Sequence, residues 1–101
     1  MSIEVYEHQT TGEAVITLGE RFDITIKREF AQAYSSFKSY KNYLIDLTYV
    51  KVIGSSAFEM LTLLREYSGG INSKITITGY NHEFIREALK DPRYKGLFKL
   101  I

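Results

Sequence analysis

The chain has 101 residues, 45% of them apolar, which predicts one domain over residues 1–101 with a single modest core. A formal net charge of +1 provides no strong field for nucleic acid or an anionic membrane. The absence of cysteine excludes a disulfide framework, a thiol nucleophile and cysteine-ligated zinc. No apolar run has the length of a signal peptide or a membrane span, so we expect a soluble, cytoplasmic protein.

The first part of the chain predicts two strands and a helix. Alternating apolar and polar residues over 3–7 predict an edge strand, and the apolar run 14–18 predicts a second strand joined to it as a hairpin. Residues 19–21 interrupt the strand pattern. Asp23 or Thr25 is the expected N-cap of a helix. The residues on its buried face are Ile26, Phe30, Ala33, Tyr34 and Phe37.

The second part alternates strands with helices. We expect a buried strand over 43–47, a helix over 57–67 and a strand over 74–78. A third helix, capped by Asn81, follows, and the apolar tail 97–101 returns as a short strand or last turn. The buried side of that helix is expected to carry Phe84, Ile85, Ala88 and Leu89. This order predicts an α/β fold with a mostly parallel sheet of four or five strands and three or four helices.

Two serines stand where the 57–67 helix begins. Ser56 and Glu59 have the spacing of a capping box, in which each side chain bonds a backbone amide of the other residue. Alternatively, Ser55 is the N-cap and Ser56 lies in the first turn with its hydroxyl outward. A helix N-terminus also suits a phosphate, because free amides and the helix dipole favour an anion. Capping and phosphorylation are compatible readings of the same serine.

The stretch 44–56 resembles the STAS domain of bacterial anti-sigma factor antagonists. That family shows an apolar strand ending in Asp-Leu, an apolar pair, and then Asp-Ser-Ser-Gly-Leu at a helix start. Here Leu44-Ile45-Asp46-Leu47, Val52-Ile53 and Gly54-Ser55-Ser56-Ala57 occupy those places. Gly54 replaces the aspartate of the motif, and Ala57 replaces its glycine. The resemblance implies phosphorylation on Ser56, with Ser55 as the second candidate.

The resemblance also implies a regulatory binding protein without catalysis of its own. In that family the unphosphorylated domain binds a serine protein kinase, which is often itself an anti-sigma factor. Phosphorylation breaks the complex, and a serine phosphatase of the metal-dependent class restores it. The residues expected to contact the partner are Asp23, Asp46, Tyr49, Gly54, Ser55, Ser56 and Ala57. Phe22 is a further candidate for an apolar contact.

Two other functions remain open. Some lone STAS domains control biofilm formation, secretion or other outputs without a sigma factor, and the sequence does not separate these outputs. A third hypothesis is a small-ligand or nucleotide sensor at the sheet edge carrying Asp23 and Asp46, since open sheets bind ligands at the carboxyl ends of their strands. Neither a cofactor nor a metal is expected. A hydrolase is not expected, because the sequence has no Gly-x-Ser-x-Gly elbow. His8 is expected in the first strand or its turn and His82 at a helix start, so neither is placed beside Ser56.

Overall fold

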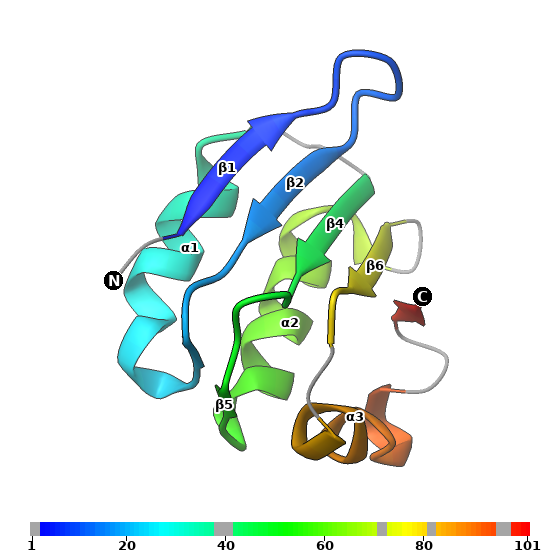
Figure 1. The fold of residues 1–101 in the computed structure, drawn as a ribbon. Helices are drawn as coiled ribbons and strands as arrows, with labels where there is room; N and C mark the ends of the chain where they lie inside the picture. The colour runs from blue at the N-terminus through cyan, green and yellow to red at the C-terminus, as the bar shows by residue number, and fades with distance from the viewer. Residues whose placement is uncertain (1–2, 38–41, 71–72, 81–82, 95–97) are drawn as a thin grey trace.

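The computed structural model describes residues 3–37, 42–70, 73–80, 83–94 and 98–101. The fold is built on a five-stranded sheet with the strand order β1-β2-β4-β6-β7 (Figure 1). The strands are β1 (Glu4–Glu7), β2 (Ala14–Thr17), β4 (Asn42–Asp46), β6 (Lys74–Thr78) and β7 (Lys99–Leu100). Only β1 and β2 pair antiparallel, while every other neighbouring pair in this sheet is parallel. The predicted α/β class, the mostly parallel sheet and the N-terminal hairpin are confirmed.

A second, two-stranded sheet lies beyond the carboxyl ends of these strands. It pairs β3 (Arg21–Phe22) in parallel with β5 (Val52–Ile53). The Gly54 amide donates to the Phe22 carbonyl at 2.9 Å, and the Lys51 amide donates to the Glu20 carbonyl at 2.7 Å. The sequence analysis did not predict this sheet, because two-residue strands are too short to show an alternating pattern.

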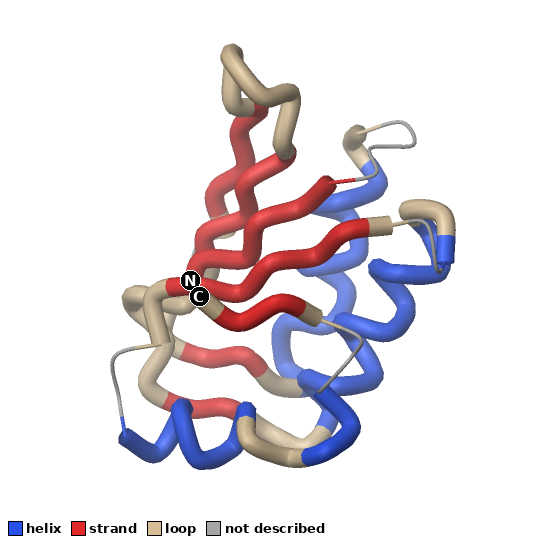
Figure 2. Tube along the Cα trace, turned by 90° about the vertical axis from the view of Figure 1, so that its right-hand side faces the viewer, coloured by secondary structure: helices blue, strands red, loops and turns tan. Residues whose placement is uncertain are grey.

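Helices cover one face of the main sheet (Figure 2). The elements are the 3-10 turn η1 (Ile24–Ile26), α1 (Lys27–Ser35), α2 (Ser56–Tyr67), α3 (Glu83–Leu89) and the 3-10 turn η3 (Pro92–Tyr94). Helices α1 and α2 lie side by side against the strands, whereas α3 lies near β5 at the end toward which β4 and β6 point (Figure 1). Within the described ranges, no helix has both the length and the apolarity that crossing a bilayer needs.

The core fills the space between the sheet and these two helices. Strand register aligns two apolar rows that are at most 2% exposed, namely Ala14, Tyr43 and Ile75, then Ile16, Ile45 and Ile77. The helices complete the core with Phe30, Met60, Leu61 and Leu64. Each large apolar side chain buried in this way stabilises the fold by about 1.5–3 kcal/mol. The hydrophobic periodicity therefore identified the inward faces of α1 and α2 correctly.

The last predicted elements are also found. Ile85 and Leu89 are buried, as expected for the inner side of α3, and the C-terminal tail pairs with β6 as β7. Asn81, the expected cap of α3, lies outside the described residues.

The turn after β6 depends on Gly79. This glycine has φ +78°, a left-handed conformation that side chains disfavour. A Cβ on Gly79 would also overlap the carboxylate of Asp46 and the hydroxyl of Thr48. The Leu47 amide donates to the Thr78 carbonyl at 2.8 Å at the same place. Gly79 therefore allows the chain leaving β6 to pass close to the chain leaving β4.

Gly79→Ala should destabilise the protein more than Gly12→Ala. Gly12 has nearly the same φ, +73°, but a Cβ there would meet nothing within 4 Å. Both variants carry the left-handed penalty of about 1–2 kcal/mol, and only Gly79→Ala adds overpacking, which typically costs about 1–3 kcal/mol. Urea denaturation monitored by circular dichroism measures the difference. Equal losses for the two variants would contradict the close approach at Gly79.

Candidate functional site

The two serines begin α2 without capping it through their side chains. Ser55 occupies the N-cap position in a helical conformation (φ −63°, ψ −24°) and makes no side-chain capping bond. Ser56 is the first helical residue, and among the described residues its hydroxyl has no hydrogen-bond partner. Ser55 is exposed and Ser56 is half-buried. Of the two predicted arrangements, the structure has the one with Ser55 at the cap position and Ser56 in the first turn.

The predicted capping box is wrong. Glu59 does not reach back to the serines, because its carboxylate pairs with the Lys27 ammonium of α1 at 3.2 Å. A capping side chain requires extended backbone at the N-cap, and Ser55 is helical instead. The Ala57 amide is satisfied by the Gly54 carbonyl at 3.1 Å. Neither serine hydroxyl is therefore needed to hold the helix start.

Asp23 caps the turn η1 that leads into α1. Of the two predicted caps, Asp23 and Thr25, the structure has Asp23. Its Oδ1 accepts from the Thr25 amide at 3.0 Å and also from the Thr25 hydroxyl. Its Oδ2 lies 2.7 Å from Nη2 of Arg21 and accepts from Nε at 2.9 Å. The bond from the Thr25 hydroxyl, and then the bonds from Arg21, lower the pKa of Asp23 below its ordinary value of 3.8, although burial opposes the shift. Asp23 is thus a fully engaged structural carboxylate.

Gly54 brings Asp23 next to the serines. A Cβ on Gly54 would lie 2.9 Å from the Cβ of Asp23, which is closer than side chains tolerate. The position that carries aspartate in the family motif is therefore a glycine here for a steric reason. The end of β5, the start of α2 and the cap of η1 meet at this point.

Asp46 does not join this group. Its Oδ1 accepts from the Thr48 amide at 3.0 Å and from the Thr48 hydroxyl, so it caps the turn that follows β4. Residues 47–51 and β5 separate it from the start of α2 (Figure 1). The sequence pattern grouped Asp46 with the serines as an expected partner contact, but it did not show that the extra β3–β5 sheet lies between them along the chain. Tyr49, in this connection, is 63% exposed.

Two predicted partner contacts are buried. Ala57 and Phe22 are both 0% exposed and belong to the core, so neither side chain can touch a partner. Ile24 and Val52, which the sequence analysis missed, are 57% and 38% exposed beside them. Ile24 falls outside the helical spacing of Ile26 and Phe30, and this spacing was the signal that could have predicted its exposure.

A small hollow of about 180 Å³ adjoins the first serine. Its lining includes Gly54, Ser55, Asp91 and Arg93. The Arg93 guanidinium pairs with Asp91 at 2.9 Å and lies 4.9 Å from the centroid of the Phe58 ring. Ser55 thus lines a hollow that also contains a cationic side chain, Arg93, and an anionic one, Asp91.

Among the described residues, no histidine bonds either serine hydroxyl. His8 lies in the β1–β2 turn, where its Nδ1 accepts from the Thr11 amide at 3.4 Å, and His82 lies outside the described residues. Across the described ranges, no three histidine, aspartate or glutamate side chains gather in a group that could hold a metal ion.

Ser55→Ala and Ser56→Ala should each lower the free energy of unfolding by less than about 0.5 kcal/mol, below the range for a capping serine. The reason is that neither hydroxyl bonds a backbone amide of the helix. Urea denaturation measures both values. A loss of about 1 kcal/mol or more in either variant would show that its side chain caps the helix in solution.

Asp23→Asn should reduce stability at neutral pH and have little effect in acid. Because the folded state lowers the pKa of Asp23, ionised Asp23 stabilises the fold above pH 3.8, and this contribution is lost as the pH falls through the folded pKa. Thermal melts from pH 7 downward should therefore converge for the wild type and Asp23→Asn. The control is Glu66→Gln, which removes an exposed carboxylate of α2 that forms no ion pair among the described residues. Parallel curves for the wild type and Asp23→Asn would contradict the assignment.

Comparison with known proteins identifies the family. No family model matches the chain. A STAS-domain containing protein of Pseudomonas aeruginosa (strain UCBPP-PA14) is 33% identical over 89 residues, which cover 87% of this chain and 87% of that protein.

Solved structures share the fold at low identity. The anti-sigma factor antagonist SpoIIAA in its unphosphorylated form superposes with a TM-score of 0.63 at 10% identity, covering 99% of this chain and 87% of that one. Phosphorylated SpoIIAA, a Bacillus cell fate determinant, gives 0.61 at 10% identity, covering 99% and 91%. A DUF3478-family protein from Shewanella loihica PV-4, with a SpoIIAA-like fold, gives 0.59 at 16% identity, covering 99% and 84%. Since the sequence relationship spans most of both chains and the fold is SpoIIAA-like, this chain belongs to the STAS-domain proteins.

Proposed function

We propose that this protein is a phosphorylation-switched regulatory binding protein of the anti-sigma factor antagonist type. In its unphosphorylated form it binds a serine protein kinase that acts as an anti-sigma factor, and phosphorylation on Ser56 releases that partner. A serine phosphatase of the metal-dependent class returns it to the binding form. The protein acts as a single domain in the cytoplasm and is the substrate of these enzymes rather than an enzyme.

The observation that carries this proposal is the position of Ser56. It is the first residue of a twelve-residue helix, and its hydroxyl has no structural task among the described residues. A phosphate there would meet the free amides of the first turn and the positive end of the helix dipole. The fold can therefore accommodate the modification, and SpoIIAA itself has been solved in both unphosphorylated and phosphorylated forms.

A phosphate on Ser56 would change the surface more than the fold. It adds a charge of about −1.5 to −2 at neutral pH. The exposed apolar side chains of this end of the molecule are Ile24, Tyr49 and Val52. A partner that packs over them and over the serines must remove water from the phosphate, which costs several kcal/mol when the charge stays unpaired. Binding and phosphorylation therefore oppose each other.

Ser55 is the alternative acceptor because it is more exposed than Ser56. It also lines the hollow that holds Arg93. Phosphorylation of either serine would produce the same switch, and mapping the phosphorylated residue distinguishes the two acceptors.

The output of the switch is set by the partner. A sigma factor is one output, and control of biofilm formation or secretion is another with the same chemistry at Ser56. The separate hypothesis of a nucleotide sensor gains nothing from Asp23, whose carboxylate is engaged by Arg21 and Thr25, or from Asp46, which caps its own turn. A thermal-shift screen with nucleotides tests it, since a bound ligand must raise Tm.

Substitutions at the serines should separate binding from switching. Ser56→Ala should bind the kinase and resist release, because it cannot accept phosphate. Ser56→Asp should remain folded but bind at least tenfold more weakly, a loss of about 1.4 kcal/mol. Ser55→Ala should still be phosphorylated. A pull-down with the wild type and Ser56→Asp, read by mass spectrometry, identifies the kinase, and calorimetry then measures the affinities.

The same kinase with ATP provides the decisive assay. Phosphate on Ser55, or on neither serine, would reject the assignment to Ser56. Equal affinity of the wild type and Ser56→Asp would reject the switch even if Ser56 were phosphorylated.

A further inference from the structure

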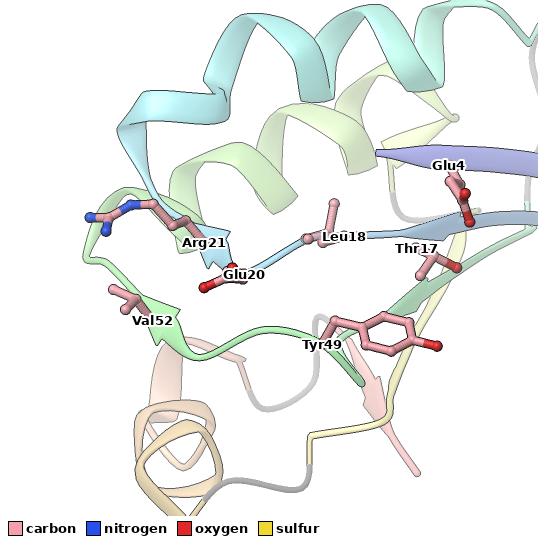
Figure 3. A pocket seen from close by; sticks show the side chains of 8 residues that line it. Glu4, Thr17, Leu18, Glu20, Arg21, Tyr49 and Val52 are labelled. Carbon is pink, nitrogen blue, oxygen red and sulfur yellow. The ribbon is translucent and has the colours of Figure 1, made fainter. Parts of the chain in front are cut away.

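A groove separate from the serines opens between the N-terminal hairpin and the small sheet. Its volume is about 740 Å³, which lies within the range of ligand pockets. Glu4 and Thr17 contribute from β1 and β2, Glu20 from the connection to β3, and Tyr49 and Val52 from the β4–β5 segment (Figure 3). The groove thus joins three stretches that are distant in the sequence, namely Glu4, residues 17–21 and residues 49–52.

The groove is acidic. Neither Glu4 nor Glu20 forms an ion pair among the described residues. Arg21, the cationic residue of the lining, is paired with Asp23, and its side chain points away from Tyr49 and Thr17 (Figure 3). Two uncompensated carboxylates therefore dominate the field inside the groove, which attracts a cation and repels a phosphate or nucleotide.

An aromatic ring lies between these carboxylates. Tyr49 is 63% exposed, and its ring extends along the groove beneath Thr17, toward the side where Glu4 lies (Figure 3). Register places Glu4 directly opposite Thr17, so both side chains lie on the same face of the sheet. An aromatic face beside carboxylates is the environment that holds a guanidinium, through stacking and charge-assisted hydrogen bonds.

We infer that this groove docks an arginine-bearing extended segment of the partner protein. The guanidinium would stack on Tyr49 and pair with Glu4 or Glu20, while Val52 contacts the apolar neighbours of the arginine. The identity of the partner as a kinase rests on the proposed function, but the specificity of the groove for a cationic segment does not. Docking here provides affinity at a place other than the serine that controls release.

A peptide probe tests the chemistry without the partner. The probe is a hexapeptide of alternating leucine and arginine, blocked at both ends, and its control has citrulline, a neutral analogue of the same shape, in place of each arginine. In two-dimensional NMR of the full chain, the arginine peptide should shift the amides of Glu4, Thr17, Glu20 and Tyr49. It should bind at least fivefold more tightly than the citrulline peptide, and added salt should weaken it.

Matched variants locate the site. Glu4→Gln/Glu20→Gln and Tyr49→Ala should each weaken the arginine peptide at least fivefold. Glu7→Gln/Glu13→Gln removes the same charge outside the groove, from the hairpin that carries Glu4, and it should leave the affinity within twofold of wild type. Equal binding of the citrulline peptide, shifts centred elsewhere, or an equal loss in the control double variant would overturn the assignment.

The groove and the switch can fail separately. A recovered kinase that binds Glu4→Gln/Glu20→Gln as tightly as wild type would overturn the groove as its docking site and leave the Ser56 switch standing. Arginine-specific peptide binding in the groove, combined with no phosphorylation of either serine, would support the groove and reject the switch.

Discussion

The contact between Gly54 and Asp23 is the constraint on which this end of the molecule depends. A Cβ on Gly54 would approach the Cβ of Asp23 to 2.9 Å, so the two backbones can meet only because residue 54 has no side chain. The same approach lets the Gly54 amide bond the Phe22 carbonyl, which holds β3 against β5. It fixes the turn that enters α1 and the start of α2 at one place, although more than thirty residues separate them in the sequence.

This arrangement would allow the proposed modification to affect binding and spare the fold. Asp23 is neutralised locally by Arg21 and bonded by Thr25, so a phosphate nearby would not meet a free carboxylate at this contact. The core beneath the helix start, including Ala57, is apolar and fully buried. A charge added on Ser56 would therefore be received by backbone amides on the outside of that core.

The sequence predicts the parts of the fold that the core specifies. The strands at 14–18, 43–47 and 74–78 and the helix at 57–67 carry runs or periods of buried residues, and all four are found. The β3–β5 pair carries no such signal, because each of its strands has only two residues. The predicted capping box is absent because the backbone of Ser55 is helical. The sequence could not show this, because Ser55 follows Gly54, whose backbone packs closely against Asp23. The groove was not predictable because its lining comes from three separate stretches of the chain.

The two edges of the main sheet bear on how any partner can attach. One edge is the four-residue strand β1, whose ends are Glu4 and Glu7, and the other is the two-residue strand β7, which begins with Lys99. Short edge strands with charged residues are poor templates for an added strand from another chain. Recognition by β-augmentation is therefore disfavoured, and the proposed complex would depend on side chains at the helix starts and in the groove. Specificity in such a complex can then change by single surface substitutions that leave the sheet untouched.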